Sequence, residues 1–199
     1  MRKFLVIVVV FFVGLSLMAQ ELSDGDKFLN VGVGIGNLVR PSGFKTNIPP
    51  IVFQYEQVVK EEFTVGGYFG FAKASFIDEG TFTLPYSPYS TELHEYKWKS
   101  TQIMIGLKGT YHFGSYLNLP EGMDAYGGVM LGYTVVTEKL EQLQGSVSLN
   151  PYLDPALKNR VLFGVLVGVR YSLSDSMAAF GELGYSTSIL QLGLSYNLP

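Results

Sequence analysis

The sequence predicts an all-β fold: an eight-stranded antiparallel up-and-down transmembrane β-barrel, preceded by a cleavable signal peptide. Three observations predict this fold class. Large apolar residues alternate with small or charged ones, as at residues 161–173, which gives a strand one apolar face. The opposite face is mostly Gly, Ala, Ser and Thr, which fit a narrow lumen. No segment after the leader has a helical period or a long apolar run.

The leader comes first along the chain. Arg2 and Lys3 precede an apolar run at residues 4–13, and Ala19 supplies a small residue at the expected cleavage position. The alternative is a transmembrane anchor, but this run is short for a bilayer core of ~30 Å, which needs ~20 residues. We therefore predict a signal peptide at residues 1–19 and one barrel domain at residues 20–199.

Strands are expected next, and alternation defines them. The predicted spans are 27–36, 50–59, 63–75, 96–113, 124–137, 161–173, 176–186 and 188–198. The apolar faces, in chain order, include Leu29, Val31, Val33 and Ile35; Ile51, Phe53 and Tyr55; Phe63, Val65, Phe69 and Phe71; Ile103, Ile105 and Leu107; Val129, Leu131, Tyr133 and Val135; Val161, Phe163, Val165, Val167 and Val169; Leu190, Leu192 and Leu194.

Alternation does not say which face points inward. A soluble barrel, the alternative, would turn its polar face to water, and that face would be rich in Lys, Glu and Asp. Here the second face carries few charges, so we place the large apolar face against lipid.

The connections predict the orientation. Short links follow the second and sixth strands, whereas longer ones are expected at 37–49, 76–95 and 138–160. Alternating long and short links are typical of outer-membrane barrels, with short periplasmic turns and long external loops. Both termini are then periplasmic. The short link around Thr187 departs from this rule.

Composition excludes several kinds of function. The chain has no cysteine, which excludes disulfides, thiolate metal sites and a lipid-modified N-terminal cysteine. Its net charge is −3 without a basic block, so no nucleic-acid partner is expected. The 23 glycines and 14% aromatic residues suit crowded strands and rings at two membrane interfaces.

The closing hairpin, AFGELGY at 179–185 followed by LQLGLSY at 190–196, is similar to the end of many small OmpA/OmpX-like barrels of the outer-membrane protein β-barrel domain family. The resemblance covers nearly all of the mature chain. It implies eight strands, assembly by the barrel-insertion machinery and usually no known activity. Such barrels commonly end on an aromatic residue that the machinery reads, whereas this chain ends Leu198-Pro199, with Tyr196 on the outward face nearby.

Four charged residues are expected in the lumen: Glu56, Lys108, Arg170 and Glu182. The nearby polar residues are Gln54, Gln102, His112 and Gln191. They could form a gate or a small polar-ligand site. Eight strands leave an interior about wide enough for side chains, and unpaired charges there are costly. We therefore favour a salt-bridged structural plug.

Aromatic residues are interpreted by their position. Tyr96 and Trp98 at the outer end of the fourth strand are expected to anchor at the headgroup level. Phe63, Phe113, Tyr111, Tyr171 and Tyr196 have the same role at the inner ends. The external loops combine Pro and Tyr, so Tyr86, Tyr89 and Tyr152 are candidates for contact with an unknown surface ligand.

Catalysis is not expected. The two histidines, His94 and His112, are about a strand length apart and cannot share a metal ion. The weak alternative is that His94, together with Ser90 or Glu92, forms part of a lipid-modifying catalytic site.

We predict a monomeric outer-membrane protein with a plugged polar lumen and a structural or surface-interaction role, in contact with outer-membrane lipid and without cofactor or metal. The alternative is a narrow passage for small polar or hydrophobic solutes.

Overall fold

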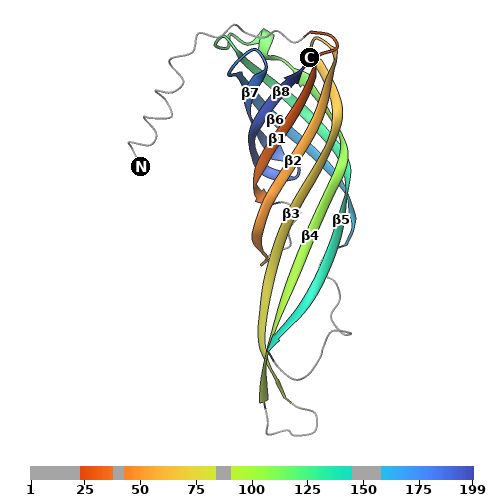
Figure 1. The fold of residues 1–199 in the computed structure, drawn as a ribbon, viewed down its shortest axis with the longest axis vertical. Coiled ribbons are helices and arrows are strands. Elements are labelled where there is room, and N and C mark those ends of the chain that lie inside the picture. The colour runs from red at the N-terminus through yellow and green to blue at the C-terminus, as the bar shows by residue number, and fades with distance from the viewer. Residues whose placement is uncertain (1–22, 38–42, 84–90, 145–157) are drawn as a thin grey trace, which may run out of the picture.

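The computed structural model describes residues 23–37, 43–83, 91–144 and 158–199, which form one closed antiparallel barrel (Figure 1). Each strand pairs with its neighbours in sequence, and β8 pairs with β1. The elements are β1 (Lys27–Asn37), β2 (Lys45–Lys60), β3 (Phe63–Thr83), β4 (Thr91–His112), η1 (Gly114–Tyr116), β5 (Met123–Gln144), β6 (Arg160–Ser172), β7 (Met177–Tyr185) and β8 (Ser188–Leu198). The predicted fold class is confirmed. No helix in the described ranges is long and apolar enough to cross a bilayer.

The predicted faces are also confirmed. Val167 is 59% exposed on the outside of β6, whereas Arg170 on the same strand is 7% exposed and points to the lumen. The same alternation runs around the ring, so the outer surface is a continuous apolar belt. Such a surface suits acyl chains and is far larger than the apolar patches of soluble monomers. The chain therefore spans a membrane as a barrel.

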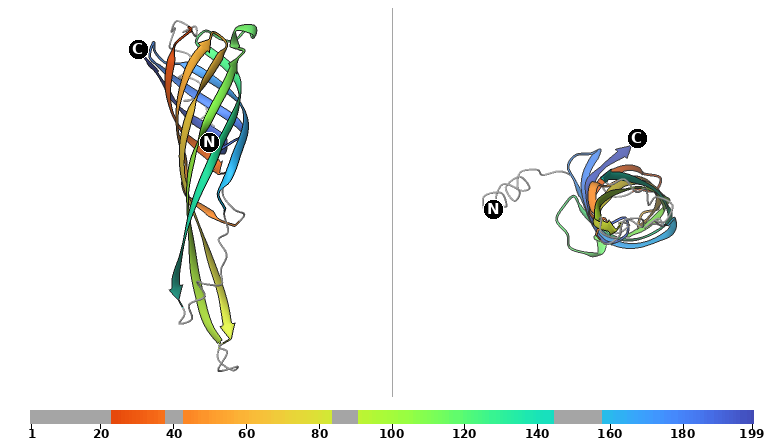
Figure 2. Two further views of the ribbon diagram at one scale, coloured as in Figure 1. Left: turned by 90° about the vertical axis from the view of Figure 1, so that its right-hand side faces the viewer. Right: turned by 90° about the horizontal axis from the view of Figure 1, so that it is seen from below.

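The two ends of the barrel differ. Three connections, between β2 and β3, β4 and β5, and β6 and β7, meet at what we call the turn end. The other four lie toward the loop end, where β3, β4 and β5 project far beyond the rest of the barrel (Figures 1 and 2). Tyr116 of η1 donates a hydrogen bond to the Glu62 carboxylate at the turn end, which raises the pKa of the tyrosine.

The predicted ends of the central strands are wrong. β2 begins at Lys45, β3 continues to Thr83, β4 begins at Thr91 and β5 continues to Gln144, so much of the expected loops 76–95 and 138–160 is strand. Alternation of apolar and small residues predicts a strand only where the outward face of that strand contacts lipid. Beyond the bilayer the outward face can be polar, and β3 and β4 keep an unbroken register from Phe63↔Tyr111 to Thr83↔Thr91.

Interior packing depends on aromatic residues that lie over glycines of the next strand. Tyr68 pairs with Gly106, Tyr126 with Gly168, and Phe180 with Gly193. A Cβ added to Gly106, Gly168 or Gly193 would lie 2.7, 2.5 or 2.6 Å from the facing ring. The Tyr68 side chain also crosses to Gly132, where a Cβ would lie 2.2 Å from its hydroxyl. Large and small residues therefore alternate across the lumen, as a narrow barrel requires.

The lumen is less polar than predicted. Eight buried residues form an apolar cluster inside the ring: Val52, Tyr68, Ala72, Met104, Tyr126, Met130, Leu162 and Leu166. They pack against the polar residues described below, so both kinds of side chain fill the interior.

We expect Gly132→Ala to lower the free energy of unfolding by about 1–3 kcal/mol, because overpacking displaces neighbours. The new methyl group would lie 2.4 Å from the Ile105 carbonyl oxygen as well as against Tyr68. Gly109→Ala is the matched control, since its nearest atom is 3.9 Å away. Urea unfolding in detergent micelles measures both variants. Equal stability of the two would contradict this packing account.

Candidate functional site

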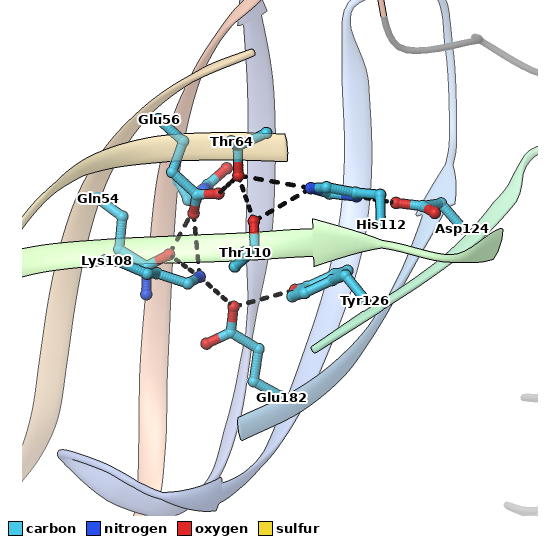
Figure 3. Close-up of polar contacts among 10 residues, drawn as sticks. Gln54, Glu56, Thr64, Lys108, Thr110, His112, Asp124, Tyr126 and Glu182 are labelled. Atoms are coloured by element: carbon cyan, nitrogen blue, oxygen red, sulfur yellow. Dashed lines mark hydrogen bonds and ion pairs between the residues drawn. The ribbon is translucent and has the colours of Figure 1, made fainter. Parts of the chain in front are cut away.

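The candidate site is a layer of charged side chains inside the lumen, centred on Lys108 of β4 (Figure 3). Its Nζ lies 3.0 Å from Glu56 Oε1 of β2 and 2.5 Å from Glu182 Oε1 of β7. Nζ also donates a 2.9 Å hydrogen bond to Gln54 Oε1. All three side chains of this ion triad are at least 95% buried. One cation thus joins two carboxylates from distant strands across the barrel.

Neutral donors complete the shell around the two carboxylates. Asn30 Nδ2 donates to Glu56 Oε1 at 2.7 Å, and Thr64 Oγ1 donates to Glu56 Oε2 at 3.2 Å. The Tyr126 hydroxyl donates to Glu182 Oε1 at 3.0 Å. The carboxylates therefore accept hydrogen bonds from four strands, as a buried ion cluster needs to remain charged.

The network continues toward the turn end through His112. Its Nε2 lies 3.1 Å from Thr110 Oγ1, which contacts Thr64 in turn. Its Nδ1 lies 2.5 Å from Asp124 Oδ2 of β5. Both His112 and Asp124 border an open hollow of about 660 Å³ at the turn end. Hydrogen-bonding groups thus form a continuous chain from this hollow to the ion triad (Figure 3).

Arg170 of β6 lies inside the lumen but outside this network. Its guanidinium packs over the Phe28 ring, with Cζ 4.5 Å from the centroid, and lies 5.8 Å from that of Tyr126. Nε and Nη1 have no hydrogen-bond partner among the described residues. A cavity of about 60 Å³ at the turn end is lined by Arg170, Ser195 and Asn197, among others. The four predicted charges therefore share the interior, but only three are in direct contact.

Two glutamates, one lysine and one arginine sum to zero charge. Long-range attraction between Arg170 and Glu56 complements the direct pairs because the lumen has a low dielectric constant.

The order Asp124–His112–Thr110 resembles that of a hydrolytic triad. However, Thr110 is 3% exposed and enclosed by the barrel, so its hydroxyl has no approach for a substrate. Within the described ranges, no group of three or more His, Cys, Asp or Glu side chains could hold a metal ion.

The structure joins residues that sequence reasoning kept apart. Thr64, Thr110 and Asp124 were not among the predicted site residues. Only the register places Thr64 opposite Thr110 and sets β5 beside β4 so that Asp124 reaches His112. Gln102 and Gln191, expected near the charges, are buried in the lumen, 0% and 3% exposed.

The aromatic prediction for β4 is wrong at its outer end. Tyr96 is 2% exposed and shares the inward face with Ser100 and Gln102, so it does not anchor in lipid. Trp98 lies on that same face by register. At the turn end, Phe63 and Tyr111 are exposed, with their rings 4.8 Å apart, in positions that suit an interface belt. The candidates Tyr86, Tyr89 and Tyr152 lie outside the described residues, as do Ser90 and the signal peptide.

Comparison with known proteins gives matches to structures alone. No family model and no curated protein matches the sequence. The Ail attachment invasion locus protein of Yersinia pestis aligns over 88% of this chain and 100% of its own, with 12% identity and a TM-score of 0.49. Its backbone structure in a phospholipid bilayer nanodisc aligns over the same shares, with 13% identity and a TM-score of 0.42. A de novo designed transmembrane β-barrel covers 90% of this chain and 100% of its own, with 14% identity and a TM-score of 0.44.

We expect Lys108→Met to lower the free energy of unfolding by about 3–5 kcal/mol, because it leaves two buried carboxylates without their cation. Lys60→Met, at an exposed turn, is the control and should change stability by no more than about 0.5 kcal/mol. Adding Glu56→Gln and Glu182→Gln to Lys108→Met should restore part of the loss. Urea unfolding in micelles tests all three. Similar stabilities for Lys108→Met and Lys60→Met would show that the buried ion contacts contribute nothing.

Proposed function

We propose that the chain is a monomeric outer-membrane protein that presents a projecting β-sheet at the cell surface and keeps its lumen closed. The observation that carries this proposal is that the strands differ greatly in length. β3, β4 and β5 have 21, 22 and 22 residues, whereas β7 has 9. About 9–11 residues cross a bilayer as a tilted strand. Roughly half of each long strand is thus in excess of what the membrane requires.

The excess forms a three-stranded sheet outside the ring. Pairing of β2 with β3 ends at Ser75, and pairing of β5 with β6 ends at Thr134, while β4 pairs on both sides beyond those points. Within the described ranges, no further strand pairs with this projecting sheet at its two edges, residues 76–83 and 137–144. At the start of the second edge, Val136 N donates a 2.9 Å hydrogen bond to Asn159 Oδ1. Exposed strand edges offer backbone groups that can pair with a strand of another protein. The projecting sheet is the surface we assign to external contact.

The base of its inward face is apolar. Phe76, Trp98 and Leu140 are consecutive partners across β3, β4 and β5. Phe44, directly before β2, stacks on Phe76 with ring centroids 5.6 Å apart and is 5% exposed. These side chains stiffen the base of the projecting sheet, which limits the entropy lost when a partner binds.

The lumen supports a closed state. The ion triad and the eight-residue apolar cluster occupy the interior, and an eight-stranded ring has room for little else. We assign the four lumen charges a structural role as a plug. No observation favours the alternative of solute passage or a catalytic activity. The turn end is assigned to the periplasm, with both termini there and insertion by the barrel-assembly machinery.

Single cysteines test the location and orientation, because the chain has none of its own. We expect Lys97→Cys, on the projecting sheet, to react with a membrane-impermeant maleimide on intact cells. Lys60→Cys, at the turn end, should react only after permeabilisation. Labelling of both on intact cells, or of Lys60→Cys alone, would contradict the orientation, and labelling of neither would contradict a surface location.

Planar-bilayer recording tests the closed lumen. The folded full chain, with insertion checked by a heat-dependent shift in gel mobility, should give no steady single-channel current because side chains fill the interior. An open porin reconstituted in the same way is the control. Steady unitary conductance from this chain would show that solutes pass and would replace the plug with a gate.

A further inference from the structure

Four lysines gather on the outward face of the barrel just above the apolar belt at the loop end. The register places outward residues in rows that run across strands β2 to β5. One row of the belt consists of Ile51, Phe71, Ile103 and Val135. The next row toward the loop end contains Lys73, Thr101 and Thr137, and the row after that contains Lys45, Lys99 and Lys139, with the buried Ser75 between Lys45 and Lys99. We call Lys45, Lys73, Lys99 and Lys139, all exposed, the rim lysines.

The rim lysines lie within reach of lipid headgroups. Lys99 is four positions from Ile103 in β4, which is ~13 Å along a strand and ~10 Å along the bilayer normal at a tilt of ~40°. The interfacial layer extends about 5–7 Å beyond the hydrocarbon core. Lysine stems reach several ångströms toward it. The Lys73 side chain points toward the apolar belt, because its Nζ lies 5.5 Å from the centroid of the Phe71 ring, which is part of that belt.

Protein groups neutralise this patch only in part. Lys99 and Lys139 are directly opposite each other on β4 and β5, a like-charge pair that destabilises an antiparallel sheet. Lys99 donates to Glu141 at 2.5 Å, which lowers the pKa of that carboxyl. Within the described ranges, Lys45, Lys73 and Lys139 form no ion pair. An anion held between strands β4 and β5 would relieve the repulsion.

The opposite rim has the opposite charge. On the rim of the turn end the basic residues are Lys27 and Lys60, whereas the acidic ones are Asp24, Asp26, Glu61, Glu62, Glu121 and Asp175; Asp124 and Arg170 pair with each other in the register of β5 and β6 one step further in. A preference for anions is therefore confined to one leaflet. A general need for charged residues at the membrane boundary would apply to both ends of the barrel. The asymmetry therefore favours a specific interaction of the rim lysines with the lipid of one leaflet.

We propose that the rim lysines bind the phosphate groups of anionic lipids in the leaflet at the loop end. The inference rests on the proposed function only in that the barrel spans a bilayer. Their nearness to the belt favours a lipid over a soluble polyanion such as a sulfated oligosaccharide. A soluble ligand would not need lysines so near the belt, and the projecting sheet carries Glu79, Glu95 and Glu141 against Lys97.

The test is the relative affinity of the barrel for spin-labelled phosphatidic acid over spin-labelled phosphatidylcholine, measured by electron paramagnetic resonance in phosphatidylcholine vesicles. We expect the full chain to prefer phosphatidic acid by at least about fivefold, since each lysine near such a surface contributes about that factor. Added salt should weaken the preference. The variant Lys73→Ala/Lys99→Ala/Lys139→Ala should lose it, and the corresponding triple Arg variant should keep it.

Lys27→Ala/Lys60→Ala is the matched control and should keep the preference. The heat-dependent gel shift confirms that each variant is folded. No preference in the unaltered chain, or an undiminished one in the triple Ala variant, would overturn the proposal. A third outcome would also overturn it. Calorimetry would show that a sulfated oligosaccharide binds through the same lysines, while the lipid preference would not depend on them. None of these outcomes would alter the cysteine-labelling or conductance results that test the proposed function.

Discussion

The narrowness of the ring is the constraint on which the rest of the structure depends. Eight strands enclose so little space that several of the buried rings lie over a glycine of the next strand. The pairs formed by Tyr68 with Gly106, Tyr126 with Gly168, and Phe180 with Gly193 show this arrangement on three sides of the lumen. Most of the other bulky apolar side chains of the membrane-spanning part point outward, where acyl chains impose no limit on volume.

The same narrowness explains how the lumen tolerates ions. A charge in this interior loses most of its hydration, so each must be matched by fixed partners. Lys108 meets two carboxylates, and those carboxylates accept further hydrogen bonds from Asn30, Thr64 and Tyr126. Strands β1, β2, β3, β4, β5 and β7 are thereby tied together by side chains as well as by backbone pairing. Arg170 is held differently, by the faces of aromatic rings.

Alternation predicted the parts of the fold that meet lipid, because a two-residue period is imposed wherever one face is apolar and the other enclosed. It identified the inward positions of Glu56, Lys108, Arg170 and Glu182 for the same reason. It failed for the outer halves of β3, β4 and β5, where water contacts the outward face and no apolar signal remains. It also assigned Tyr96 to an interface belt, although the parity of β4 turns that side chain inward.

Contacts between strands were the second feature that the sequence could not predict. The distance between His112 and Asp124, and the separation of Arg170 from the other three charges, are set by register and ring closure. No local pattern contains that information, since a shift of one residue would exchange the two faces of a strand.

The unequal strands also bear on how the ring assembles. β3 and β4 are joined by a hairpin whose paired residues are near in sequence, and their ladder runs without a bulge from one end to the other. Pairing of β1 with β8 instead unites Lys27 with Leu198, almost the two ends of the described chain. The entropic cost of loop closure is smaller for the hairpin of β3 and β4 than for the seam between β1 and β8. Pairing at that seam is therefore the step that completes the cylinder.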